Sequence, residues 1–131
     1  IQLSIHQLVK VSGAVVVTTP QNLAFADVLR AVKMFEKLEL PIYGLVENMS
    51  FFEADGKTYY PFGRGRINEY CRTHGLEHLG RIPILPAVAA ASDAGAPLVG
   101  DENATVRAYY DEIAGSLASK VSIKAFQAKD A

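Results

Sequence analysis

Residues 14–21 read Ala-Val-Val-Val-Thr-Thr-Pro-Gln, a short apolar run that ends in polar residues and a proline. The run has no polar alternation, which is typical of a strand covered on both faces in a parallel sheet. Two further segments repeat this plan: residues 42–46 lead into Glu47-Asn48-Met49-Ser50, and residues 78–82 lead into Pro83-Ile84. Open α/β sheets bind ligands beyond the carboxyl ends of their strands, so we expect a site where the three polar segments meet.

Helical patterns separate the three expected strands. Apolar periodicity predicts helices at about residues 1–9, 22–38, 66–74, 86–92 and 102–119. Asn22 is a candidate N-cap, and residues 93–97 are expected to form a loop. Asp55-Gly56 between aromatic runs predicts a β-hairpin. Strands that alternate with helices predict an α/β fold with a doubly wound, mostly parallel sheet and a small hairpin insertion.

Composition limits the classes of function. The 131 residues are 50% hydrophobic and 21% charged with a formal net charge of −1, which gives no electrostatic reason to expect a nucleic acid partner. No apolar run reaches the roughly 18 to 20 residues that span a bilayer, so we expect a soluble protein with no transmembrane segment.

Three strands are too few for a doubly wound sheet, and the chain opens inside an apolar helix; we therefore expect part of a larger protein.

Cysteine and histidine offer little local chemistry. Cys71 is the only cysteine, which excludes an intrachain disulfide and a metal site made of cysteines alone. It is either an ordinary helix cysteine or one ligand of a cluster shared with another chain. His74 and His78 are four residues apart, but Gly75 interrupts the helix, so we expect no metal site. No local Ser-His-Asp or Cys-His spacing predicts a catalytic group.

Six blocks occur in a characteristic order: Thr18-Thr19-Pro20-Gln21, Met34-Phe35, Glu47-Asn48-Met49-Ser50, Phe62-Gly63, Gly80-Arg81-Ile82-Pro83-Ile84 and Ala91-Ser92-Asp93-Ala94-Gly95-Ala96-Pro97. This order, over about residues 1–118, resembles the Mrp-type P-loop ATPases, which are relatives of the MinD/ParA group that carry iron–sulfur clusters. Residues 23–25 and 55–63 look most similar to its chloroplast high-chlorophyll-fluorescence branch, which serves [4Fe-4S] assembly. The resemblance implies the C-terminal part of a MinD/ParA-like P-loop NTPase domain at residues 1–120 and a polar tail at 121–131.

Two departures from the family pattern limit what the resemblance implies. The glycine-rich phosphate-binding loop is absent, so this chain alone is not expected to hydrolyse ATP. A Cys-x-x-Cys that follows Glu-Asn-Met-Ser in many relatives is replaced by residues 51–56, as in the chloroplast branch. The resemblance therefore implies ATP and Mg in the complete protein, and a [4Fe-4S] cluster whose ligands lie outside this chain.

The resemblance implies that this chain contains the base-binding side of a nucleotide site. Its candidate residues are Gln21, Asn48, Met49, Pro83, Ile84 and Leu85. Asn48 offers both an acceptor and donors, as an adenine edge requires, or it braces its own loop. Thr19, Pro20 and Gln21 lie beside the phosphates in relatives, although a turn that caps the next helix is the alternative.

The implied function is an ATP-binding iron–sulfur cluster carrier or assembly factor. The alternative is a catalytically inactive paralogue that serves as a structural subunit of a larger assembly, such as a photosynthetic complex. A partition-type ATPase fits the blocks less well. Expected partners are a homodimer or related subunit and iron–sulfur apo-proteins or a larger protein assembly. We expect the chloroplast stroma if the source is photosynthetic, and otherwise the cytoplasm or an organellar matrix.

The predicted hairpin carries the densest group of aromatic residues: Phe51, Phe52, Tyr59, Tyr60 and Phe62. Either the hairpin packs on its own domain, or the excess of aromatic side chains forms a contact surface for a protein partner.

Overall fold

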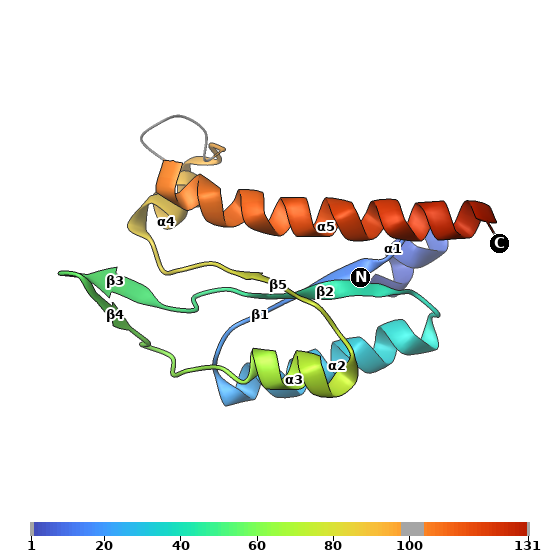
Figure 1. The fold of residues 1–131 in the computed structure, drawn as a ribbon, viewed down its shortest axis with the longest axis horizontal. Coiled ribbons are helices and arrows are strands. Elements are labelled where there is room, and N and C mark those ends of the chain that lie inside the picture. The colour runs from blue at the N-terminus through green and yellow to red at the C-terminus, as the bar shows by residue number, and fades with distance from the viewer. Residues whose placement is uncertain (1, 98–103, 131) are drawn as a thin grey trace.

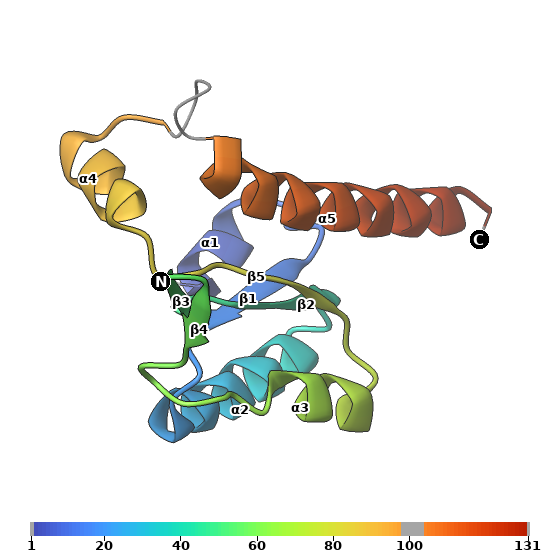
Figure 2. The ribbon, with the colours of Figure 1, turned by 60° about the vertical axis from the view of Figure 1, so that its left-hand side comes forward.

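The computed structural model describes residues 2–97 and 104–130. Its three-stranded parallel sheet lies between two layers of helices (Figure 1). The strands, in spatial order, are β1 (Ala14–Thr18), β2 (Ile42–Glu47) and β5 (His78–Arg81). One face carries α2 (Asn22–Lys37) and α3 (Ile67–His74), and α1 (Gln2–Leu8) and α5 (Ala104–Asp130) lie on the other side (Figure 2). Outside the sheet are the hairpin strands β3 (Phe52–Ala54) and β4 (Lys57–Tyr59), and helix α4 (Pro86–Ala94). The α/β fold and the parallel sheet predicted from the sequence are confirmed.

The central strand β2 is paired on both edges and buried from Tyr43 to Glu47. Its register places Glu47 opposite Thr18 of β1 on one side and opposite Arg81 of β5 on the other. Because all three strands are parallel, their last residues lie side by side at one edge of the sheet. The loops that follow them are therefore brought together, as the sequence predicted.

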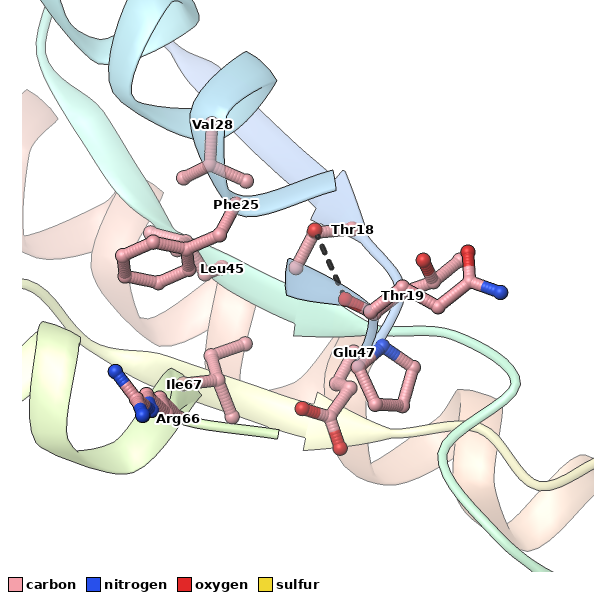
Figure 3. Close-up of a pocket in the computed structure, with 10 residues that line it drawn as sticks. Thr18, Thr19, Phe25, Val28, Leu45, Glu47, Arg66 and Ile67 are labelled. Atoms are coloured by element: carbon pink, nitrogen blue, oxygen red, sulfur yellow. Dashed lines mark hydrogen bonds between the residues drawn. The ribbon is translucent and has the colours of Figure 1, made fainter. Parts of the chain in front are cut away.

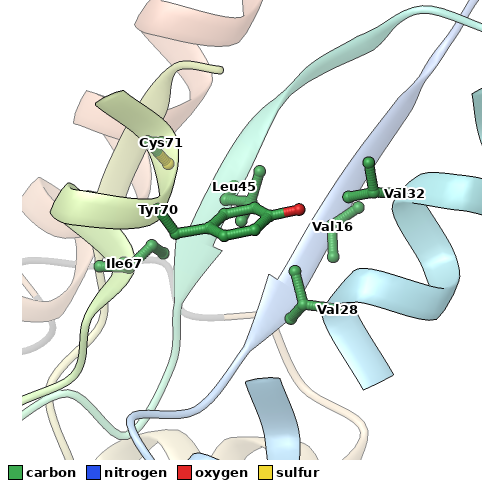
Figure 4. Close-up of a cluster of buried hydrophobic side chains, with 7 residues drawn as sticks. All are labelled: Val16, Val28, Val32, Leu45, Ile67, Tyr70 and Cys71. Atoms are coloured by element: carbon green, nitrogen blue, oxygen red, sulfur yellow. The ribbon is translucent and has the colours of Figure 1, made fainter. Parts of the chain in front are cut away.

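The main core lies between the sheet and the helices α2 and α3 (Figure 4). It consists of Val16, Val28, Val32, Leu45, Ile67, Tyr70 and Cys71. Leu45 of the central strand is 1% exposed, and the ring of Phe25 meets Tyr70 edge-on at a centroid distance of 4.8 Å. Burial is the main cause that raises the pKa of the Cys71 thiol, and Glu77 adds to it. Cys71 is therefore an uncharged core residue at neutral pH.

Three expected boundaries are wrong. The helix α2 already includes Asn22, and its N-cap is Gln21, whose extended backbone provides no side-chain cap hydrogen bond. The helix α4 includes Asp93 and ends at Gly95, which has a left-handed φ of 64°. The last helix continues to Asp130 instead of ending near 119, with residues 121–127 exposed. Alanine, lysine and glutamine are good helix formers, so the segment stays helical without a core-facing side. The start expected for this helix, residues 102–103, lies outside the described residues.

Two glycines provide a matched test of how α5 packs on the sheet. A Cβ at Gly80 would lie 2.5 Å from Cγ1 of Ile113, so Gly80→Ala should lower the free energy of unfolding by about 1 to 3 kcal/mol. A Cβ at Gly115 meets no described atom within 4 Å outside its own helix, so Gly115→Ala should raise it by roughly 0.5 to 1 kcal/mol. Urea unfolding of the full-length protein measures both. Changes of the same sign would contradict the packing.

Candidate functional site

Backbone hydrogen bonds extend beyond the ends of the three strands and join their loops. Asn48 N–H donates to the carbonyl oxygen of Thr18 at 2.7 Å, and Ser50 N–H donates to that of Ile82 at 3.0 Å. The carbonyl oxygen of Phe51 accepts from Ile84 N–H at 2.7 Å. The turn at residues 48–50 is therefore the middle one of three connected segments. The structure brings Asn48 and Met49 beside the other candidate residues, while their binding role stays a prediction.

The orientation of the Asn48 side-chain amide follows from its hydrogen bond. Its Oδ1 accepts a hydrogen bond from Met49 N–H at 2.9 Å, and Met49 itself has a left-handed φ of 52°. Oδ1 is assigned to this position because the N–H requires an acceptor. Among the described residues, Nδ2 of Asn48 has no hydrogen-bond partner. Asn48 therefore braces its own turn with the oxygen and still presents a donor, which suits the ring-nitrogen acceptors of adenine.

The segment after β5, residues 83–85, offers few free backbone N–H donors to a ligand. Pro83 is buried and has no N–H, and the N–H of Ile84 is already bonded to Phe51. Leu85 is the N-cap of α4 in an extended conformation, and its carbonyl oxygen accepts from Val88 N–H at 3.1 Å. These residues can offer a base an apolar surface and carbonyl oxygens rather than a row of backbone donors.

Thr18 and Thr19, at the end of β1, line two hollows of very different size. One is a small cavity of about 10 Å³, enough for a single water, between the strand ends and the segment that enters α3 (Figure 3). The other is an open groove of about 410 Å³ along β1 and α2. Thr18, Thr19 and Asn48 all line the groove, which is much the larger of the two hollows. Of these two hollows Gln21 lines only the cavity, and its role beside a nucleotide stays a prediction.

Asp27 of α2 is a charged residue on the wall of the groove. The structure shows an exposed ion pair, with Nη1 of Arg30 2.9 Å from Oδ1 of Asp27. Such exposed pairs contribute little to stability, and Asp27 still lines the groove wall.

Glu47 is the functional candidate that the sequence analysis missed. Its side chain ends β2 and is buried, with the residue only 3% exposed. Oε1 accepts a hydrogen bond from Oγ of Ser50 at 2.6 Å and lies 4.0 Å from Nε of Arg81. A carboxylate at the end of an otherwise apolar strand was the available signal, because buried acidic groups require dedicated partners.

The predicted hairpin is confirmed, and its aromatic side chains divide into two groups. The turn residues Asp55 and Gly56 have φ values of 52° and 73°, as a type I′ hairpin requires. Two of the five rings have partners outside the two hairpin strands: the ring of Phe51 lies 6.0 Å from that of Tyr109, and Arg64 lies over Tyr60. Phe52 and Tyr59 lie opposite each other across the hairpin with ring centroids 6.5 Å apart, and together with Phe62 they remain exposed, by 36%, 47% and 39%. Part of the hairpin therefore packs on its own domain, and partner binding stays a prediction.

Within residues 2–97 and 104–130, no three His, Cys, Asp or Glu side chains come together in a way that could hold a metal ion. Across the same part of the chain, no helix is both long enough and apolar enough to cross a membrane.

A parallel sheet with three joined loops at its carboxyl edge defines the class of open α/β domains that bind ligands at that edge. The family model described as ParA, NUBPL iron-transfer P-loop NTPase, matches residues 1–118. The chain therefore belongs to this family of P-loop NTPases, as its sequence blocks indicated.

Named relatives agree with this membership. The chloroplastic Fe-S cluster assembly factor HCF101 of Arabidopsis thaliana is 50% identical over 99 residues, which are 76% of this chain and 19% of the relative. The iron-sulfur cluster carrier protein of Aquifex aeolicus is 48% identical over 101 residues, which are 76% of this chain and 28% of the relative. The matched part of this chain thus spans about a fifth of the first relative and somewhat more than a quarter of the second.

One solved structure has a similar fold. The nucleotide-binding protein of Archaeoglobus fulgidus, in complex with ADP, is similar with a TM-score of 0.62 and 39% identity. The match covers 71% of this chain and 39% of that one.

Substitutions at Asn48 separate base binding from loop bracing. Asn48→Ala in the full-length protein should weaken ATP binding by about 1 to 3 kcal/mol, the cost of an unpaired polar group. Asn48→Asp keeps the acceptor for Met49 N–H but removes the Nδ2 donor, so it should weaken binding as much. Isothermal titration calorimetry measures both, with Asn68→Ala on α3 as the control. Parental affinity in Asn48→Asp would show that Asn48 only braces the turn.

Proposed function

We propose that the full-length protein is an ATP-binding iron–sulfur cluster carrier or assembly factor, and that this chain supplies the base-binding side of its nucleotide site. The observation that carries the proposal is the 48–50 turn, which holds Asn48 at the groove with a donor available. Family membership and the names of the relatives support the carrier function.

The residues of this chain have distinct tasks in the proposed site. Asn48 reads the base through Nδ2, and the exposed Met49 side chain covers it from water. Thr19, half-buried on the groove wall, lies toward the phosphates. Four further residues lie around the base in this proposal: Gln21, Pro83, Ile84 and Leu85.

The described residues do not fit a resident Mg²⁺. No cluster of three acidic or histidine ligands is found among them, and the carboxylate of Glu47 is already bonded to Ser50. Mg²⁺ prefers carboxylates together with substrate phosphates. We therefore assign the metal to parts of the protein outside the described residues, and the phosphate cradle to a glycine-rich loop that this sequence does not contain.

The cluster itself is cargo, and its thiolate ligands also lie elsewhere. Clusters of the [4Fe-4S] type are held by several cysteine thiolates, whereas this sequence contains Cys71 alone. Burial of Cys71 and its raised pKa oppose formation of a thiolate. In this proposal the chain senses nucleotide and contacts partners rather than binding iron.

Partners and location follow from the same proposal. A carrier delivers its cluster to iron–sulfur apo-proteins, and the exposed rings of the hairpin are the surface we propose for that contact. A homodimer or a related subunit completes the assembly. The likeness to chloroplastic relatives supports the plastid stroma as the location.

Anaerobic transfer tests the proposed function. Full-length protein reconstituted with iron and sulfide should restore activity to an apo-enzyme that requires a [4Fe-4S] cluster, such as apo-aconitase, and ATP should change the rate. A structural subunit without carrier activity predicts no stable cluster and no transfer. That result would replace the proposal with the alternative.

Cys71→Ala provides a test of the cluster assignment. Because Cys71 is a core residue, the variant should lose up to a few kcal/mol of stability through the cavity that it creates. It should retain the full iron and sulfide content of the parent after reconstitution, measured at a temperature at which both proteins are folded. A proportional loss of iron would make Cys71 a ligand.

Phe52→Ala and Tyr59→Ala test the hairpin surface. If either ring is a central anchor, its removal should weaken binding of the apo-protein by roughly 2 kcal/mol or more. Phe126→Ala is the matched control, because Phe126 is an exposed aromatic residue in the C-terminal part of α5, and that end of the helix lies far from the hairpin (Figure 1). Surface plasmon resonance with the apo-protein provides the affinities. Unchanged binding by both hairpin variants would rule out the surface.

A further inference from the structure

The Glu47 carboxylate lies where the segments of the candidate site converge. It ends the central strand, directly before Asn48, and it lines the small cavity together with Pro20 and Arg66 (Figure 3). Three of its neighbours come from different parts of the chain: Ser50, Gly65 and Arg81. One buried group therefore lies beside the loops that follow β2 and β4 and beside the last residue of β5.

The bond to Ser50 fixes the turn that carries Asn48. Both partners are buried, and their Oε1 to Oγ distance of 2.6 Å is typical of a charge-assisted hydrogen bond. Asn48 and Met49 lie between the two bonded residues. Their backbone is thus anchored at both ends, through the chain at Glu47 and through the carboxylate bond at Ser50, and Met49 within this turn has a left-handed φ of 52°.

Gly65 connects the same carboxylate to the far end of the hairpin. A Cβ at Gly65 would collide with Oε2 of Glu47 and would lie 3.2 Å from Cα of Pro20. Only a glycine leaves room for such a close approach. The segment from 51 to 64, which includes the hairpin, thus begins beside Ser50 and returns to Glu47 at Gly65.

Arg81 completes the arrangement on the side of β5. Its Nε lies 4.0 Å from Oε1, and its side chain is partly exposed. The adjoining backbone is tied to the same residue, because Ile82 N–H donates to the carbonyl oxygen of Glu47 at 2.8 Å. Glu47 thereby contacts the start of the segment that contains Pro83, Ile84 and Leu85.

We propose that Glu47 is a positioning residue that couples nucleotide bound at Asn48 to the conformation of the hairpin. This inference rests on the proposed nucleotide site. A ligand that orders Asn48 also orders Ser50, and through the Glu47 carboxylate it orders both ends of the hairpin segment. Coupling of this kind is reciprocal, so a partner bound to the hairpin changes nucleotide affinity by the same factor.

Hydrogen exchange of full-length protein, with and without saturating ATP, tests the coupling. In the parent, ATP should slow exchange of the amides at residues 52–59. Ser50→Ala removes the bond but keeps the buried carboxylate, and it should weaken ATP binding about tenfold, the equivalent of one charge-assisted bond. At saturating ATP it should also lose the protection of the hairpin. Glu47→Gln keeps an acceptor for Ser50 but loses the charge. This variant should lose part of the ATP-dependent protection of the hairpin.

Glu77→Gln is the control, because Glu77 is an exposed carboxylate paired with Lys120 before β5 begins. It should behave as the parent. A purely structural role for Glu47 predicts lower stability with undiminished hairpin protection in the ATP-saturated Ser50→Ala variant, and that result overturns the inference. The inference also fails if the parent binds ATP without protecting the hairpin. A parent that binds no ATP would instead refute the proposed function, and the coupling with it.

Discussion

Parallel pairing of β2 with both neighbours is the constraint on which the site depends. The strand is buried on both faces, and Leu45 packs at the centre of the core. The register of β1 against this strand is specified by its alternation, since a shift of one residue would turn the buried Val16 and Thr18 to the exposed face that Val17 occupies. The register in turn sets Thr18, Glu47 and Arg81 side by side, from which the three loops continue.

Much of this arrangement could be predicted because it follows from local patterns. The limits of β1 and the Asp55-Gly56 turn agree with the sequence, since apolar runs and turn residues determine them directly. The N-cap of α2 could not be predicted in this way, because backbone geometry gave Gln21 that position. The length of α5 was missed because helix propensity, rather than a core-facing stripe, continues it beyond residue 119.

The site shows the same division between local and long-range information. Asn48 could be located from its position after a strand, but the engagement of its Oδ1 depends on the left-handed backbone of Met49. The role of Glu47 depends on Gly65, 18 positions later in the chain, and on Arg81. No sequence pattern places those residues beside one carboxylate; only the assembled sheet and the returning hairpin segment do so.

The proposed site is one side of a larger one, in which this chain reads the base while phosphate, metal and cluster are held elsewhere. Photocrosslinking of full-length protein with 8-azido-ATP, followed by peptide mapping, tests this central claim most directly. The account predicts labelling within residues 48–50 or 83–85 that excess ATP suppresses. Labelling that ATP suppresses equally well, but that lies wholly outside residues 1–131, would contradict it.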